Sequence, residues 1–252
     1  MAVDMFVWYE LMTSDVDAAL AFYGKVLGWT SADFPGSPER YVIVSPANGK
    51  GIGGVMALPE GVPQPAWIGY VGVKDIDATL RGFTEAGGVI HRGPWEIPTV
   101  GRIAVAGDPF GAVIAVSSVQ GASDGPSEAV DTAGQGRGSW HELHTPDIEA
   151  GLAFYGAQFG WSKGTTHDMG PNGIYQIIAA DGRDIGGAVK TQPGEPPSWL
   201  YYFGAASMAA SAGTVQGAGG TVLMGPHEVP GGAWILICKD PQGAMFALVG
   251  GK

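Results

Sequence analysis

Residues 8–29 and 140–161 decide the fold of this chain. They read WYELMTSDVDAALAFYGKVLGW and WHELHTPDIEAGLAFYGAQFGW, and 13 of the 22 positions are identical at an offset of 132 residues. Identity at one fixed offset over so long a stretch is typical of an internal repeat. We therefore interpret the chain as a tandem duplication.

Both copies carry the pattern of a strand followed by a helix. Asp15 and Asp147 stand directly before an apolar pattern with helical spacing, where a side chain can cap the first turn. Gly28 and Gly160 follow the last apolar residue of that pattern, where a left-handed residue commonly ends a helix. The sequence predicts one helix between each pair of caps.

A weaker repeat divides each half again. Residues 75–80 (DIDATL) resemble residues 15–20 (DVDAAL), and Ser207 can cap the corresponding helix of the second half. Each module then reads as a strand, a helix and about three strands, with the helix on one face of the sheet. The opposite face is left to line a cleft.

The segment between the halves has the composition of a linker. Residues 117–139 (SSVQGASDGPSEAVDTAGQGRGS) have almost no large apolar side chain. We predict a first domain over 1–119, a linker over 120–138 and a second domain over 139–252.

Charge and cysteine content exclude several functions. Lys and Arg number 13 against 24 Asp and Glu, a net charge of −11, which argues against nucleic acid and anionic membranes as partners. The single cysteine, Cys238, rules out an intramolecular disulfide and a CxxC motif. No leader or membrane-spanning run is recognisable, so we expect a soluble cytoplasmic protein with a small-molecule ligand.

The pattern D-[VI]-[DE]-x-x-L-A-F-Y-G-x-x-[LF]-G-W, followed one module later by D-P-x-G-A, resembles the vicinal oxygen chelate superfamily. That superfamily includes glyoxalase I, extradiol dioxygenases and bleomycin-resistance proteins. The resemblance implies an α+β fold of four βαβββ modules in two glyoxalase-like domains, each with a sheet-lined cleft. Because all four modules lie in one chain, a monomer and a homodimer both stay open.

The resemblance also implies four positions that would hold a divalent metal. In this chain they carry Trp, Gly, an aliphatic residue and Ala, none of which offers a suitable side-chain donor. We therefore expect no cofactor, although a metal at other positions is not excluded. The positions are Trp8, 53–54, Ile68 and Ala115 in the first half, and Trp140, 186–187, Leu200 and Ala247 in the second.

Strand alternation brings the candidate catalytic residues Glu10, Glu142 and His144 to the faces expected to line the clefts. A carboxylate beside tryptophan in a partly dry site can act as an acid or a base, or attract a cationic ligand. Trp8 and Trp140 are candidate ligand-binding residues. The alternative is that the glutamates pair with arginine or backbone N–H groups and the tryptophans fill core volume.

Three further residues are candidates for ligand binding. Tyr70 and Tyr202 have the cleft-facing parity on the opposing strands, although packing explains a strand tyrosine equally well. Arg102 could neutralise Glu10 or bind an anionic substrate.

The second half alone places histidine on the strand that carries the glutamate. His141 should point away from Glu142 and His144, so at most two ligands for a metal converge there. We interpret the other histidines, which are His91, His167 and His227, as solvated.

Three functions follow from this pattern. The first is a metal-independent protein that binds or transforms a small organic molecule in an aromatic and acidic cleft. The second is a metal-dependent lyase or oxidoreductase, resembling glyoxalase or the dioxygenases, with noncanonical ligands such as His144 and Glu142. The third is a regulatory or interaction module without catalysis.

Overall fold

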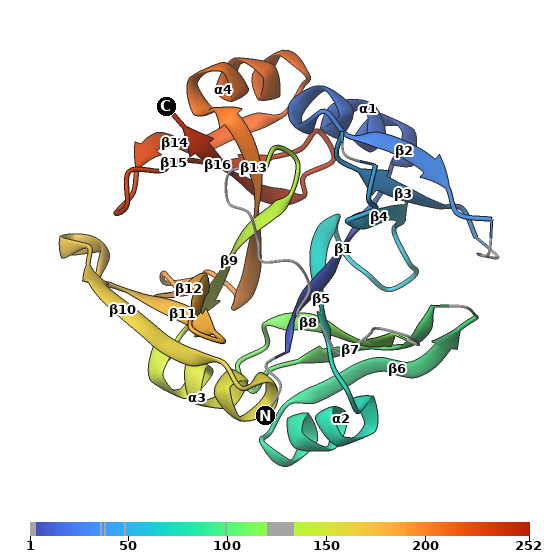
Figure 1. Cartoon of the computed structure of the whole chain (residues 1–252), viewed down its shortest axis with the longest axis vertical. Helices are drawn as coiled ribbons and strands as arrows, with labels where there is room; N and C mark the ends of the chain where they lie inside the picture. The colour runs from blue at the N-terminus through green and yellow to red at the C-terminus, as the bar shows by residue number, and fades with distance from the viewer. Residues whose placement is uncertain (1–3, 36, 38, 48, 99, 120–133) are drawn as a thin grey trace. The chain divides into compact units, whose positions relative to one another are not determined.

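The computed structural model describes residues 4–35, 37, 39–47, 49–98, 100–119 and 134–252. Each half of the chain forms one mixed, eight-stranded sheet, and the fold is α+β as predicted (Figure 1). The strand order is β2-β3-β4-β1-β5-β8-β7-β6 in the first sheet and β10-β11-β12-β9-β13-β16-β15-β14 in the second. Identical orders in the two sheets confirm the duplication.

The first half contains two βαβββ modules. Their elements are β1 (Met5–Thr13), α1 (Val16–Leu27), β2 (Thr30–Asp33), β3 (Tyr41–Ser45), β4 (Gly53–Ala57), β5 (Ala66–Gly72), α2 (Ile76–Glu85), β6 (Val89–Ile97), β7 (Gly101–Gly107) and β8 (Val113–Val119).

The second half repeats this order and adds a short 3-10 helix. Its elements are β9 (Gly138–Thr145), α3 (Ile148–Phe159), β10 (Ser162–Asp168), η1 (Gly170–Asn172), β11 (Ile174–Ala180), β12 (Arg183–Lys190), β13 (Ser198–Ser207), α4 (Met208–Gly217), β14 (Thr221–Glu228), β15 (Trp234–Lys239) and β16 (Met245–Gly251).

Local signals fix the helix ends where the sequence predicts them. Asp15, Asp75, Asp147 and Ser207 each accept a hydrogen bond from a backbone N–H of the first turn. Gly28 and Gly160 end α1 and α3 in the left-handed conformation, with φ of 72° and 75°. The capping residues and the two C-terminal glycines are confirmed.

In every module the first strand pairs in parallel with the last. In the first half β1 pairs with β4 and β5 with β8, and in the second half β9 pairs with β12 and β13 with β16. This pairing sets Glu10 opposite Gly54 and Glu142 opposite Gly187. The two candidate glutamates therefore stand at equivalent positions beside a glycine.

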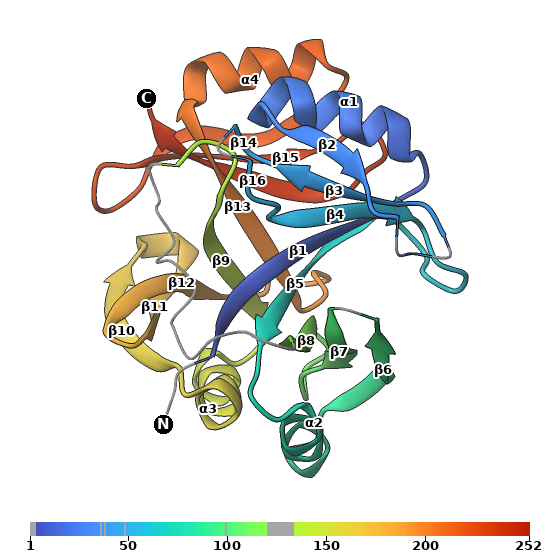
Figure 2. The same ribbon diagram turned by 45° about the vertical axis from the view of Figure 1, so that its right-hand side comes forward.

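The chain also divides into two compact units, each of which combines one module from each half. Unit 1 consists of Met1–Val7, Ile68–Ala129 and His141–Trp199, and unit 2 of Trp8–Trp67, Val130–Trp140 and Leu200–Lys252. Within unit 1, α2 lies beside α3, and within unit 2, α1 lies beside α4 (Figure 2).

The repeated Phe-Tyr and Gly-Trp pairs build the aromatic core of each unit. In unit 2 the ring of Tyr23 stacks on Trp29 with centroids 5.6 Å apart, and in unit 1 Tyr155 stacks on Trp161 at 5.7 Å. Tyr23 and Tyr155 are 1% and 0% exposed. These motifs therefore serve packing, which accounts for their presence in both halves.

Residues 120–133 of the predicted linker lie outside the described residues, and the limits of the two domains stay a prediction. Among the helices that are described, none is long and apolar enough to cross a membrane.

Candidate acid–base site

Glu142 and His144 lie on the same face of β9, as strand parity predicts. Nε2 of His144 is 2.9 Å from Oε1 of Glu142. Leu143 and Thr145, which alternate with these residues, are fully buried on the opposite face. A short strand thus brings one carboxylate and one imidazole into direct contact.

Glu195, which the sequence analysis did not single out, completes this cluster. It lies in the loop between β12 and β13, and its Oε1 is 2.6 Å from Nδ1 of His144. Its Oε2 accepts the backbone N–H of Gln192 at 2.8 Å, and its own N–H donates to the Gln192 carbonyl at 3.0 Å. The turn therefore holds the carboxylate in place against the imidazole.

The arrangement favours a charged imidazole. Burial disfavours the imidazolium, but the hydrogen bond and charge of Glu142 and the charge and hydrogen bond of Glu195 together outweigh it and raise the pKa of His144. The side chains of Glu142, His144 and Glu195 are 9%, 17% and 32% exposed. The cluster is partly dry yet reachable from solvent.

His141 points away from this cluster, as predicted from strand alternation. Its ring stacks on Phe6 with centroids 3.9 Å apart and planes 11° from parallel, and its Nδ1 is 2.6 Å from the Ile185 carbonyl. Burial lowers the pKa of His141 to about 4, although the hydrogen bond to Ile185 opposes this. His141 is therefore a neutral structural residue at pH 7.

A tyrosine beside each glutamate also went unrecognised in the sequence. A Cβ at Gly187 would overlap the ring of Tyr175 on β11, and a Cβ at Gly54 would overlap the ring of Tyr41 on β3. Glycine is required at both positions because the tyrosine ring occupies the space of a side chain.

Tyr41 links Trp8 to Glu10 in the first half. Nε1 of Trp8 donates to the Tyr41 hydroxyl at 2.8 Å. Burial, followed by the charge of Glu10, raises the pKa of Tyr41; the hydrogen bond from Trp8 lowers it, and the hydrogen bond to Glu10 raises it further. Met12 stands where the second half has His144. The first half therefore keeps the carboxylate and lacks the imidazole.

Trp140 and Tyr202 lie in an apolar environment of unit 2. Tyr202 is only 2% exposed, and Trp140 packs against the cluster to which it belongs. This environment supports packing as a role for Trp140, and a role of either residue in ligand binding stays a prediction. The buried members of the cluster are Leu200, Tyr202, Ala247 and Val249, and the partly buried ones are Trp140, Ala233, Ile235 and Ile237.

Tyr70 and Arg102 are the remaining residues that the sequence predicts to bind a ligand. Tyr70 is 5% exposed on β5. Arg102 forms two hydrogen bonds to the Asp77 carboxylate, at 2.6 and 3.0 Å, in an ion pair that is largely exposed. The guanidinium is therefore paired with a carboxylate of α2. A ligand-binding role for Arg102 stays a prediction.

The residues at the metal positions implied by the resemblance do not fit a metal. Trp8 donates its indole N–H to Tyr41, and tyrosine rings cover Gly54 and Gly187. Leu200 and Ala247 belong to the apolar cluster. Within the described part of the chain, no group of three or more His, Cys, Asp and Glu side chains is arranged to hold a metal ion.

Comparison with known proteins agrees with this architecture. The sequence profile of the "Glyoxalase/Bleomycin resistance protein/Dioxygenase superfamily" matches residues 5–116. The second half repeats the sequence of the first, so the likeness to this superfamily extends to both halves as a resemblance.

Two relatives match nearly the whole chain. The "Putative glyoxylase CFP32" of Mycobacterium tuberculosis is 29% identical over 248 residues, which cover 96% of this chain and 93% of that protein. The "Anthracycline biosynthesis protein DauV" of Streptomyces sp. (strain C5) is 29% identical over 265 residues, covering 96% and 91%.

Solved structures show the same fold at low sequence identity. The Mn(II)-bound glyoxalase from Novosphingobium aromaticivorans is 16% identical with a TM-score of 0.68, covering 99% of this chain and 82% of that one. The 2,3-dioxygenase LapB from Pseudomonas sp. KL28 is 13% identical with a TM-score of 0.67, covering 100% and 93%. These likenesses concern the fold alone.

Proposed function

We propose that the chain is a cytoplasmic protein that binds a small organic molecule at the Glu142–His144–Glu195 cluster and exchanges a proton with it. The observation that carries the proposal is the double engagement of His144, whose two ring nitrogens each face a carboxylate oxygen, at 2.9 and 2.6 Å. An imidazole with a raised pKa, held between two carboxylates in a partly dry site, is an arrangement suited to acid–base chemistry.

Each residue has a distinct part in this proposal. Glu142 takes a proton from an acidic group of the bound molecule, and the electron pair stays on that molecule. His144 donates its Nε2–H to Glu142 and keeps the carboxylate oriented, while Glu195 holds the other ring nitrogen. Return of the proton from Glu142 to the same or another atom of the molecule completes the exchange.

The first half supports binding without the same chemistry. It retains Glu10 and Trp8 around Tyr41, but Met12 replaces the histidine. We propose that Glu10 is a hydrogen-bond acceptor for a ligand group or for the protein itself.

The donor set disfavours the metal-dependent alternative. A metal on His144 would have to displace Glu142 or Glu195 from a ring nitrogen. Protein purified without chelator, incubated with nickel, zinc, manganese and ferrous ions and then desalted should retain far less than one metal per chain. Near-stoichiometric metal would instead make a metal-dependent lyase or dioxygenase the leading function.

A ligand screen tests the proposed site. The names of the relatives suggest the panel, which comprises anthracyclines and the adduct of methylglyoxal with glutathione, a glyoxalase-type substrate, together with a general library of polar aromatic compounds. We expect at least one compound that raises the melting temperature of the native chain and of Glu228→Gln but not of Glu142→Gln. Glu228 is an exposed residue on β14 and serves as the matched control.

The outcome is decisive when all three proteins melt at similar temperatures without ligand. If every stabilising compound acts equally on Glu142→Gln, the acid–base cluster is not the binding site. For a compound that binds at the cluster, exchange of a labelled proton between the compound and water in the native chain would show acid–base chemistry in addition to binding.

A further inference from the structure

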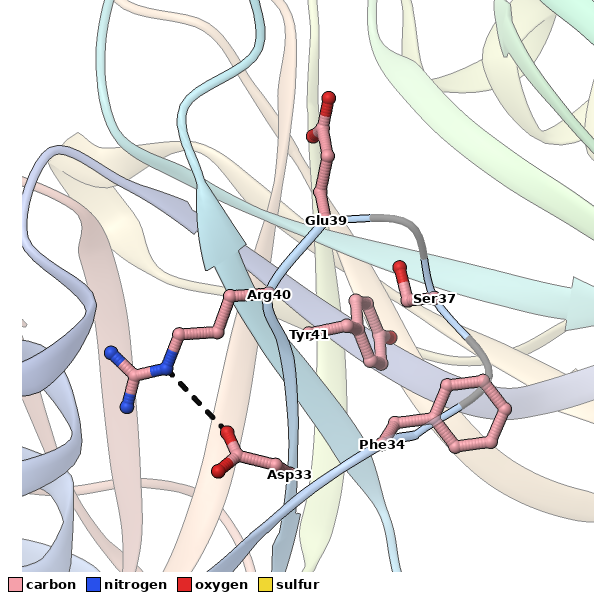
Figure 3. A pocket seen from close by; sticks show the side chains of 6 residues that line it. All are labelled: Asp33, Phe34, Ser37, Glu39, Arg40 and Tyr41. Carbon is pink, nitrogen blue, oxygen red and sulfur yellow. Dashed lines mark hydrogen bonds and ion pairs between the residues drawn. The ribbon is translucent and has the colours of Figure 1, made fainter.

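A cavity lies in unit 2, at the loop that joins β2 to β3. It has a volume of about 250 Å³, is open to solvent and lies within one module of the first half (Figure 3). None of its residues belongs to the Glu142–His144–Glu195 cluster. They are Asp33, Phe34, Ser37, Glu39, Arg40 and Tyr41.

Two aromatic rings form one side of this cavity. The rings of Phe34 and Tyr41 have centroids 6.3 Å apart and planes 76° from parallel, so they meet almost at a right angle. The Tyr41 hydroxyl is held by Trp8 at 2.8 Å and by Glu10. The hydroxyl is therefore engaged within the protein, which leaves the ring as the part of Tyr41 available to a ligand.

The charge of the cavity is negative. Arg40 is its only cation, and the guanidinium extends away from the two rings toward Asp33 (Figure 3). It pairs with Asp17 at 2.8 Å and with Asp33 at 3.5 Å, so its charge is already matched. Glu39 also belongs to the lining and is exposed, with its carboxylate directed away from the two rings (Figure 3). The cavity thus combines two aromatic rings with two carboxylates, Asp33 and Glu39, against the single guanidinium of Arg40.

The loop is particular to the first half. Seven residues join β2 to β3, and only five join β10 to β11. The residue after β2 is Phe34, whereas the residue after β10 is Met169. The right-angled pair of rings therefore has no counterpart in the second copy, although Tyr41 itself is matched by Tyr175.

We propose that this cavity binds a small organic cation, such as a substituted ammonium group, on the faces of Phe34 and Tyr41. A cation above an aromatic ring is attracted by the negative potential of the ring face, and a nearby carboxylate adds to this attraction. A neutral molecule of the same shape gains only apolar contact. This site is independent of the acid–base cluster and of its proposed chemistry.

Choline and its uncharged isostere 3,3-dimethylbutan-1-ol are the probes that test the proposal. Each is titrated into the full chain at constant ionic strength, and binding is followed by backbone amide NMR. We expect choline to shift the amide signals of Phe34 and Tyr41 with a Kd on the order of millimolar. The alcohol should bind at least about fivefold more weakly.

Variants locate the site. Phe34→Leu should weaken choline binding about two- to fivefold, because one aromatic ring is lost. Glu39→Gln, as a separate single variant, should also weaken choline binding, and more so at low salt. Phe110→Leu, in the turn between β7 and β8, is the matched control and should bind as the native chain does. A native-like amide spectrum of each variant shows that it folds.

Three results would overturn the proposal. They are equal affinity for choline and the alcohol, no shift at Phe34 or Tyr41 up to about 50 mM choline, and native affinity in a folded Phe34→Leu variant.

Discussion

Oε1 of Glu195 lies 2.6 Å from Nδ1 of His144, although 51 residues separate them in the chain. Glu142 contacts the other ring nitrogen of His144, so the imidazole lies between two carboxylates. The contact with Glu195 also explains why the pKa of this largely buried histidine is raised, since Glu142 alone would have to offset the whole cost of burial.

Replacing Glu195 by glutamine should lower the pKa of His144. The substitution removes the negative charge, while burial continues to oppose the imidazolium. Titration of the histidine ring signals by NMR measures this change, with Glu228→Gln as the control that should leave the value as it is. An unchanged pKa of His144 in Glu195→Gln would show that Glu142 alone raises it.

His144 should also make stability depend on pH in a defined direction. Its pKa is raised in the folded chain, so the contribution to folding is fully present below the unfolded value of 6.5 and is lost as pH rises through the folded value. His144→Gln should therefore cost more unfolding free energy near pH 6 than near pH 9, with roughly 1–3 kcal/mol lost at the lower pH. Urea unfolding of the native chain and of His144→Gln at both pH values measures this cost. A cost that does not change with pH would contradict the prediction.

His141, three residues earlier on the same strand, should act in the opposite sense. Its pKa falls from 6.5 to about 4 on burial, so the unfolded chain binds the extra proton between these values. Stability should fall by up to roughly 3 kcal/mol as pH drops from 6.5 to 4, and then level off. His141→Gln, which can still donate to the Ile185 carbonyl, should show a smaller loss in the same urea experiment. An equal acid sensitivity in both proteins would assign the effect to other groups.

Features that depend on residues close together in the chain could be predicted from the sequence. Asp15 and Gly28 cap a helix through neighbours within one turn, and Glu142 and His144 share a face because they are two residues apart on a strand. Such features need no knowledge of the tertiary fold. The structure confirms both of them.

The residues that were missed act over longer distances or across a change of register. Glu195 lies in a loop rich in proline, and no periodicity describes the path of such a loop. Tyr41 and Tyr175 are equivalent, but their offset is 134 rather than 132, so comparison at one fixed offset passes over them. A search that allowed short insertions could have found the tyrosines.

The repeat also left open which modules pack together. The hydroxyl of Tyr155 donates to Oδ2 of Asp108 at 3.0 Å and accepts the indole N–H of Trp199 at 2.9 Å. Oδ1 of Asp108 accepts three backbone N–H groups, those of Phe110 and Gly111 in the D-P-F-G turn and that of Ala112 after it. The tyrosine motif of one half is thus bound to the turn motif of the other half. Both motifs were recognised, but their partnership depends on tertiary packing.

Replacing Tyr155 by phenylalanine should destabilise the chain by about 2–4 kcal/mol, because the buried Trp199 N–H and the Asp108 carboxylate each lose a partner. Tyr23→Phe should have a similar effect in unit 2, where Tyr23 joins Asp240 at 3.1 Å and Trp67 at 2.8 Å. Urea unfolding of Tyr155→Phe, Trp199→Phe and the double variant measures the coupling, and the double variant should lose less than the sum of the two single losses. A loss below about 0.5 kcal/mol in Tyr155→Phe would show that water replaces the hydroxyl at little cost.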